Sequence, residues 1–234
     1  MKLSIIIPAH NEESTIEQML YKVLSVDLGD WQKEIIVVND GSTDKTKGII
    51  QRWESSLREN SHLITRVIHH PVNLGKGAGI KSALERVSGD YVIIQDADLE
   101  YDPGDIPDLL SLISDAEQAV VFGKRGYGAC PERGFHYVVG AWMLTAVYNF
   151  LFGQKLTDLY TCYKLIPAEA LKSLNIQSAG FEFEAEVACK LAKLGYKIVE
   201  MPIHYRPRNK SQGKHIGLND FFKGFWAILK YRVK

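Results

Sequence analysis

The feature that most limits the fold of this sequence is an alternation of short apolar runs, rich in Ile and Val, with segments of helical periodicity. This alternation predicts parallel strands joined by crossover helices, and therefore an α/β fold with a mostly parallel sheet flanked by helices. We expect strands at residues 3–7, 34–38, 64–68, 91–94, 119–122 and 197–201, with Pro8 ending the first. We expect helices at residues 76–87, 135–152 and 182–194, and an amphipathic helix at the C-terminus.

Length, charge and cysteine content narrow the class of protein. The chain has 234 residues, of which 46% are hydrophobic, and we expect a single domain over residues 1–234. Its 28 basic and 28 acidic side chains give no net field that would favour nucleic acid. The cysteines lack ligand-like spacing, and the N-terminus runs directly into a strand without a signal peptide. Both features predict a cytoplasmic protein.

Polar clusters follow four of the expected strands at the point where each strand ends. They are His10-Asn11-Glu12, Asn39-Asp40, Asp96-Ala97-Asp98 and Lys124-Arg125. In open parallel sheets, ligands bind at the carboxyl ends of the strands. The four clusters therefore predict one binding site at this edge of the sheet.

Asp96 and Asp98 lie one residue apart at the end of a strongly apolar strand. Two carboxylates that close repel each other unless a cation lies between them. Hard oxygen ligands suit Mg²⁺ or Mn²⁺, which can bridge the phosphates of a nucleotide. So short a pattern also fits an acidic loop that caps the helix near Asp105. The metal hypothesis therefore depends on the neighbouring motifs.

Four ordered motifs surround these residues: IIIPAHNEE at 5–13, IIVVNDGSTDKT at 35–46, NLGKGAGIKSAL at 73–84 and DYVIIQDADLEYDP at 90–103. Further segments are TDLYTCYKLI at 157–166, FEFEAEV at 181–187, GYKIVEMPIHY at 195–205 and RNKSQGK at 208–214. The first set resembles the family-2 inverting glycosyltransferases of GT-A fold. The second is similar to the dolichyl- and polyprenyl-phosphate mannose and glucose synthases. The resemblance implies a Rossmann-like sheet and transfer of a hexose from a GDP- or UDP-hexose.

The resemblance also implies roles for individual residues. The nucleotide-sugar donor would contact Pro8, Ala9, Glu12, Asp40, Lys76, Asp96 and Arg125. Mg²⁺ or Mn²⁺ would be held by Asp96, Asp98 and Glu100, the last at a position where related synthases often have Gln. Catalysis would depend on Asp98, Asp158, Arg208 and Lys214, and the acceptor phosphate would contact Arg133 and Thr161. Residues 1–125 would bind donor and metal, and residues 126–234 would shape the acceptor side.

Two kinds of acceptor are consistent with the sequence. A polyprenyl or dolichyl phosphate needs no general base, because a phosphate monoester has a second pKa of about 6 and is largely dianionic at neutral pH. A saccharide hydroxyl needs a base, and the candidates are Asp158, Glu182 and Glu184. We expect the lipid phosphate and keep the hydroxyl as the alternative.

Two features depart from the family pattern. The Asp-x-x-Ser-Gly motif reads Asp158-Leu-Tyr-Thr161-Cys162, and the usual membrane-spanning tail is not found. Instead, an apolar stripe with flanking basic residues and the uncharged segment 135–152 predict a peripheral protein on the cytoplasmic face of a membrane. The stripe comprises Leu218, Phe221, Phe222, Phe225, Trp226 and Leu229. The alternative is that the stripe packs on the protein's own core, and a membrane-protein partner or a homo-oligomer stays open.

Rival functions fit the sequence less well. A nucleotidyltransferase would carry a Gly-rich basic loop after the first strand, where this sequence is acidic. Gly75, Gly77 and Gly79 lack the position and spacing of a dinucleotide-binding fingerprint. The alternative of another class is a nucleotide-sugar-binding subunit without turnover, against which the intact Asp96 and Asp98 argue.

Overall fold

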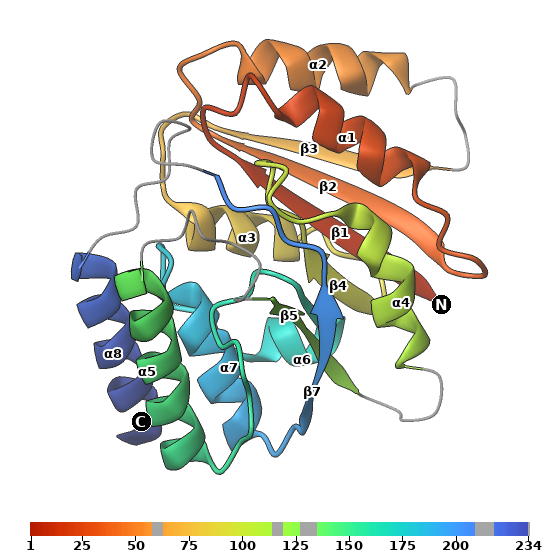
Figure 1. The fold of residues 1–234 in the computed structure, drawn as a ribbon. Coiled ribbons are helices and arrows are strands. Elements are labelled where there is room, and N and C mark those ends of the chain that lie inside the picture. Colours follow the sequence, from red (N-terminus) through yellow and green to blue (C-terminus); the bar gives the residue numbers. More distant parts are fainter. Residues whose placement is uncertain (58–62, 114–118, 127–134, 209–217, 234) are drawn as a thin grey trace.

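The computed structural model describes residues 1–57, 63–113, 119–126, 135–208 and 218–233 (Figure 1). The strands are β1 (Lys2–Ala9), β2 (Gln32–Asp40), β3 (Ile64–His70), β4 (Tyr91–Ile94), β5 (Val120–Arg125), β6 (Lys164–Pro167) and β7 (Ile198–Ile203). The α-helices are α1 (Ile16–Ser25), α2 (Thr46–Ser56), α3 (Lys76–Leu84), α4 (Ile106–Ser111), α5 (Phe135–Phe152), α6 (Ala168–Ser173), α7 (Phe183–Lys193) and α8 (Leu218–Val233). A short 3-10 turn, Pro103–Asp105, precedes α4.

The strands form one sheet in the order β3-β2-β1-β4-β6-β5-β7. The pairs β1-β2, β1-β4, β2-β3 and β5-β7 are parallel, whereas β6 runs antiparallel to both β4 and β5. The parallel strands β1, β2 and β4 therefore end at the same edge, as the sequence predicted. The α/β fold with a mostly parallel sheet and C-terminal helices is confirmed.

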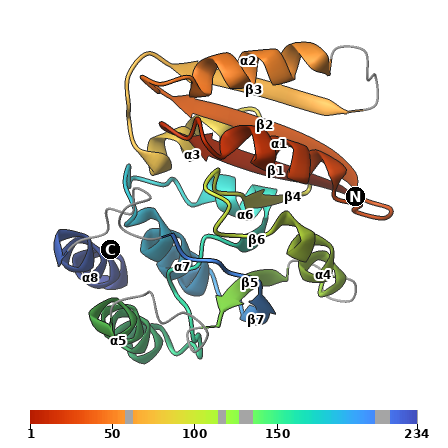
Figure 2. The ribbon, with the colours of Figure 1, turned by 45° about the horizontal axis from the view of Figure 1, so that its top comes forward.

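Two apolar cores cover the two faces of the sheet, because successive strand residues point to opposite faces. Ile5 and Ile7 of β1 pack in the core that also contains residues of α1, α2 and α4. Ile6 packs in the opposite core, with residues of α3, α5, α6, α7 and α8. Figures 1 and 2 show α5, α7 and α8 grouped together at the C-terminal half of the sheet. In the described part of the chain, no helix combines the length and the apolar character needed to cross a bilayer.

Two strand predictions differ from the structure. Pro8 does not end β1, which continues to Ala9, with Pro8 opposite Val38 of β2. Since β4 pairs with β1 only over Leu3–Ile6, β1 has one neighbour at Pro8, and proline is tolerated at such an edge. The strand β6 was not predicted, because its sequence Lys-Leu-Ile-Pro has only two apolar residues between Lys164 and Pro167, whereas all four residues of β4 are apolar.

The turn after β2 brings the backbone close to the segment before α3, and glycine is needed there. Gly41 has φ of +63°, and a Cβ atom at this position would lie 2.2 Å from the carbonyl carbon of Val72. Gly29 has a similar φ of +59°, but a Cβ atom there would meet nothing within 4 Å. A side chain would therefore meet the same backbone strain at both positions. It would also be crowded at Gly41, but not at Gly29.

We expect Gly41→Ala to lower the free energy of unfolding by about 3 kcal/mol or more, and Gly29→Ala by about 1 kcal/mol. Denaturant unfolding with unchanged m-values measures both. If the two variants lost the same free energy of unfolding, the close approach of Gly41 to Val72 would contribute nothing to the cost of the substitution.

Candidate functional site

The loops after β1 and β2 are joined by hydrogen bonds at the predicted edge of the sheet. The backbone N–H of Glu12 donates to Thr46 Oγ1 at 2.8 Å, and the backbone N–H of Thr43 donates to Asn11 Oδ1 at 2.8 Å. Ala9 is buried and Pro8 is half-buried at the end of β1. Glu12 is thus held above the ends of β1 and β2, where a donor was expected.

Asp40, at the end of β2, is buried and organises the start of α3. Its carboxylate accepts the backbone N–H groups of Leu74 at 3.0 Å and Gly75 at 2.8 Å, and His70 Nδ1 lies 2.7 Å from Oδ1. These contacts fix the residue that precedes Lys76, the first residue of α3. Asp40 therefore fixes the position at which α3, and with it Lys76, begins.

Arg208 gathers the acidic side chains of the site around one guanidinium. Its Nη1 and Nη2 atoms lie 3.0 and 3.1 Å from the two carboxylate oxygens of Glu12. Nη2 also lies 3.0 Å from Asp98 Oδ2, and Nε lies 4.0 Å from Glu100 Oε1. Glu12 and Arg208, which are 196 positions apart in the sequence, thus meet at one point together with Asp98 and Glu100.

The strand-like segment around Tyr205 holds the acidic loop after β4. Glu100 accepts the backbone N–H of Arg208 at 2.8 Å and the hydroxyl of Tyr205, and its carbonyl accepts the backbone N–H of Arg206 at 2.8 Å. Asp105 accepts the backbone N–H of His204 at 2.7 Å. The position of Arg208 is therefore coupled to that of Glu100.

The acidic loop has the electrostatics of a cation site. Burial, with further contributions from Asp96 and Glu100, raises the pKa of Asp98 to about 7, although Arg208 opposes the shift. In the described residues, no three carboxylate, histidine or cysteine side chains are gathered as a ready metal site. Arg208 and Lys76 neutralise the acidic groups instead. The carboxylates of Asp96, Asp98 and Glu100 offer the hard oxygen donors that a divalent cation prefers, so these three residues could hold one.

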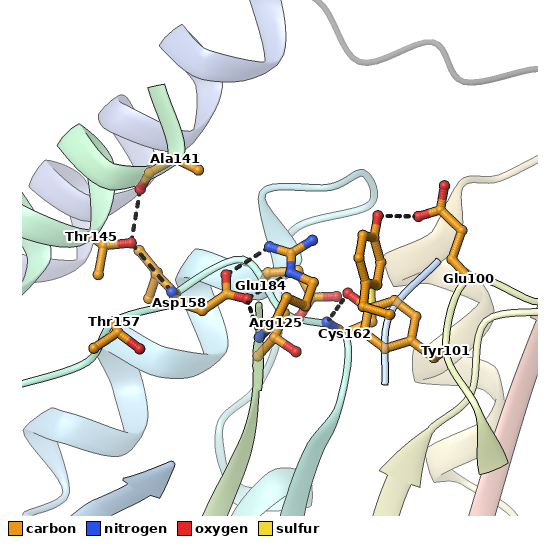
Figure 3. A network of polar contacts seen from close by, with 12 residues as sticks. Glu100, Tyr101, Arg125, Ala141, Thr145, Thr157, Asp158, Cys162 and Glu184 are labelled. Atoms are coloured by element: carbon orange, nitrogen blue, oxygen red, sulfur yellow. Dashed lines mark hydrogen bonds and ion pairs between the residues drawn. The ribbon is translucent and has the colours of Figure 1, made fainter. Parts of the chain in front are cut away.

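Asp158 and Arg125 form a buried ion pair (Figure 3). Arg125 Nε lies 2.6 Å from Asp158 Oδ2, and Nη2 lies 2.7 Å from Oδ1. The Asp158 side chain is fully buried, and its backbone N–H donates to Glu200 Oε1 at 2.9 Å. Arg125 also lies 5.2 Å below the ring of Tyr205. The pair thus connects the Asp158 loop with the segment that carries Arg208.

Thr161 is buried, and its hydroxyl has no hydrogen-bond partner within the part of the chain that the structure describes. An unpaired buried hydroxyl is costly, which is consistent with a ligand partner such as an acceptor oxygen. Two further predicted residues, Arg133 and Lys214, lie outside the described residues.

The sequence interpretation missed Tyr205, Glu200 and Lys164. Tyr205 lies within a motif that resembles the family, so its hydroxyl could have been considered as a partner for an acidic residue. Glu200 alternates with apolar residues in β7 and resembles any solvated strand position. Lys164 is fully buried at the start of β6. A lysine beside an apolar run gives no signal of its buried partner.

Comparison with known proteins identifies related sequences and structures. Residues 4–174 match the model of glycosyl transferase family 2. The low-salt glycan biosynthesis hexosyltransferase Agl6 of Haloferax volcanii is 30% identical over 210 residues, covering 88% of this chain and 48% of Agl6. The dolichyl-phosphate beta-glucosyltransferase ALG5A of Trichomonas vaginalis is 28% identical, over 99% of this chain and 73% of its own length.

Among solved structures, glucosyl-3-phosphoglycerate synthase from Mycobacterium tuberculosis, in complex with UDP, has the same fold. Its TM-score is 0.70 at 22% identity, and the match covers 99% of this chain and 80% of that one. At this sequence identity, the similarity shows that the two proteins share the arrangement of the sheet and helices.

Proposed function

Since this chain belongs to glycosyl transferase family 2, we propose that it transfers a hexose from a UDP- or GDP-hexose, with inversion, to a polyprenyl or dolichyl phosphate at a membrane surface. The observation that carries the proposal is the convergence of Glu12, Asp98 and Glu100 on Arg208 at the carboxyl edge of the sheet. Residues 1–125 provide the donor half, and residues 126–234 provide the acceptor half.

Asp96, Asp98 and Glu100 would hold Mg²⁺ or Mn²⁺ in this enzyme. Glucosyl-3-phosphoglycerate synthase, which has the same fold, has been solved with Mg²⁺ and UDP, and with Mn²⁺ and UDP, and this supports the proposal of a divalent cation. When bound, the cation neutralises charge on the nucleoside diphosphate as it leaves. Arg208 lies at the same carboxylates, so its guanidinium can move from Glu12 and Asp98 to the diphosphate and add a second positive charge.

The acceptor assignment follows from how the candidate bases are occupied. Both oxygens of Asp158 are bonded to Arg125, and the carboxylate of Glu184 lies between Lys76 and Lys164. Glu182, whose Oε1 accepts the backbone N–H of Gly180 at 3.3 Å, is the candidate base left for the hydroxyl alternative. Burial would raise the pKa of Glu184, but Lys164 and Lys76 outweigh it and lower the pKa. Groups held as ion pairs are poor proton acceptors, so an acceptor that arrives already ionised is favoured. A phosphate monoester is such an acceptor.

The reaction is then a single displacement at the anomeric carbon. A phosphate oxygen of the acceptor forms the new bond to this carbon while the bond to the diphosphate oxygen breaks on the opposite face. The electron pair leaves with the nucleoside diphosphate, where Arg208 stabilises the charge. Arg133 and Thr161 are proposed to orient the acceptor phosphate, and Lys214 is proposed to act with Arg208 in catalysis. The relationship to a dolichyl-phosphate glucosyltransferase supports this choice of acceptor.

Aromatic side chains exposed on α5 and α8 support a membrane surface as the place of reaction. Trp142 and Phe150 of α5 are 67% and 87% exposed, and Phe222 and Trp226 of α8 are 64% and 68% exposed. The two helices pack against each other, so these side chains belong to one region of the surface. Lys223 and Arg232 are also exposed on α8 and would face anionic headgroups.

We expect the protein to float with anionic liposomes, and Phe222→Ser combined with Trp226→Ser to reduce the bound fraction at least about tenfold, because two large apolar side chains no longer enter the interface. Leu112→Ser is the matched control, since Leu112 is 42% exposed at the end of α4, which packs in the other core. Equal flotation of the double variant and the wild-type protein would contradict membrane binding through α8.

A screen of donors tests the proposed reaction. UDP- and GDP-hexoses are supplied with Mn²⁺, first alone, then with polyprenyl phosphate, and then with soluble saccharides. We expect release of nucleoside diphosphate to increase strongly with polyprenyl phosphate. Transfer to saccharides instead would support the hydroxyl-acceptor alternative, and binding without any turnover would support the non-catalytic alternative.

A further inference from the structure

Four charged side chains from separate parts of the chain form a continuous row beside the proposed donor site, buried at one end and partly exposed at the other. The ammonium of Lys164, at the start of β6, lies 2.5 Å from Glu184 Oε2 on α7. Glu184 Oε1 lies 3.2 Å from Lys76 Nζ, which in turn lies 2.8 Å from Asp96 Oδ1. The charges alternate in sign along the row, so each is neutralised by its neighbours.

The stability of the fold does not explain why this row exists. The Lys164 side chain is fully buried, and the Glu184 side chain is only 3% exposed. Removing two charges from water is costly, and apolar residues of similar volume often serve the fold equally well or better. The ion pair of Lys164 and Glu184 is therefore better explained by a role in holding a neighbouring side chain in position.

The end of the row is the ammonium of Lys76. Lysine is a flexible point charge with three N–H donors. Here the acceptors are Asp96, Glu184 and Cys162, whose Sγ lies 3.1 Å from Nζ. These three contacts hold Lys76 in place against Asp96.

We propose that Lys164 and Glu184 are positioning residues, which hold Lys76 against Asp96 and thereby orient the first carboxylate of the Asp96-Ala97-Asp98 motif for a metal-bound nucleoside diphosphate. Cys162 completes the arrangement from the loop before β6, because it contacts the same ammonium. This inference rests on the proposed function of the site. Glu184 then acts through Lys76 and Asp96, and it is not the base that the hydroxyl alternative would need.

The test removes the pair without leaving an unpaired buried charge. In the variant Lys164→Met with Glu184→Gln, a neutral amide replaces the charged carboxylate beside Lys76, and both buried charges disappear. We expect the variant to unfold cooperatively, and to bind Mn²⁺ with UDP or GDP about 10- to 100-fold more weakly in titration calorimetry. The KM for the donor should rise by a similar factor, while the KM for the acceptor stays unchanged.

A second ion pair on the same helix provides the matched control. Lys190 Nζ lies 2.5 Å from Glu186 Oε1, and Glu186 is fully buried two residues after Glu184. Besides this ion pair, Glu186 accepts the backbone N–H groups of Gln177 and Ser178, and Lys190 donates to the carbonyls of Leu174 and Asn175. We expect Lys190→Met with Glu186→Gln to change thermal stability and to leave nucleotide affinity within about twofold. A loss of affinity in this control as large as in the first variant would overturn the positioning role.

Cys162 gives a test with little risk to the fold, because it is small and only partly buried. We expect Cys162→Ala to weaken binding of the Mn²⁺–nucleotide pair by about tenfold, and Cys162→Ser to restore it, because a hydroxyl also accepts from Lys76. Wild-type affinity in both Cys162→Ala and the Lys164→Met and Glu184→Gln double variant would overturn the inference. The proposed function itself would fail differently, by an absence of binding and transfer with every UDP- and GDP-hexose in the wild-type protein.

Discussion

Asp98→Asn is expected to lower hexose transfer on the order of 1000-fold, because it removes a charged oxygen ligand from the centre of the proposed metal site. The amide has nearly the same shape as the carboxylate, so the loss reflects charge and not packing. Titration of Mn²⁺ in the presence of nucleotide should show a corresponding loss of affinity. Excess chelator should abolish transfer by the wild-type enzyme for the same reason.

Stability provides an independent measurement for this variant. The pKa of Asp98 is raised to about 7 in the folded chain, mainly by burial and by Asp96 and Glu100. A carboxyl whose pKa is higher in the folded than in the unfolded chain opposes folding once the pH exceeds its unfolded pKa, and the full penalty is present above about pH 7. We therefore expect Asp98→Asn to be at least as stable as the wild-type protein at pH 8.

The matched control is Asp102→Asn, in the same acidic loop. Asp102 is 43% exposed and pairs with Lys22 at 3.3 Å, away from Arg208. It should retain activity within about twofold, as is usual for exposed ion pairs. Full activity of Asp98→Asn, or of the wild-type enzyme in chelator, would contradict the metal assignment.

Arg208→Gln is expected to have two opposite effects. Transfer should fall by about 100- to 1000-fold, because the leaving diphosphate loses a positive charge. Affinity for Mn²⁺ in the absence of nucleotide should increase, because the guanidinium no longer competes with the cation for Glu12 and Asp98. Calorimetry and steady-state kinetics on the same preparation measure the two effects.

Arg206→Gln controls for the general loss of positive charge in this segment, since Arg206 is exposed and only its backbone contacts Glu100. It should leave both the rate and the Mn²⁺ affinity nearly unchanged. If Arg208→Gln bound Mn²⁺ more weakly than the wild-type protein, Arg208 would support the cation site and not compete with it.

The sheet and its acidic edge could be predicted because the information is local. The strand β4 is an uninterrupted apolar run, and Asp96 and Asp98 follow it directly, so their position follows from the ends of parallel strands. Arg208 could be assigned to the site only through the family resemblance. Nothing in its neighbourhood in the sequence indicates that it meets Glu12.

The buried ion pairs could not be predicted, because each depends on contacts between distant elements. The sequence placed Arg125 at a strand end, but not beside Asp158, whose buried carboxylate occupies it from another loop. Lys164 and Glu184 lie on β6 and α7, and no periodicity records that their side chains meet. Such pairs follow from packing, in which burial forces opposite charges together.

The central claim is that the acceptor group is a phosphate. Its most direct test compares polyprenyl phosphate with the polyprenol of the same chain length, in the same vesicles, with a labelled nucleotide-hexose and Mn²⁺. We expect labelled lipid to form from the phosphate alone, because no base is needed to ionise it, whereas the alcohol requires one. Labelling of the polyprenol at a comparable rate, or of a soluble saccharide in preference to either lipid, would contradict the account.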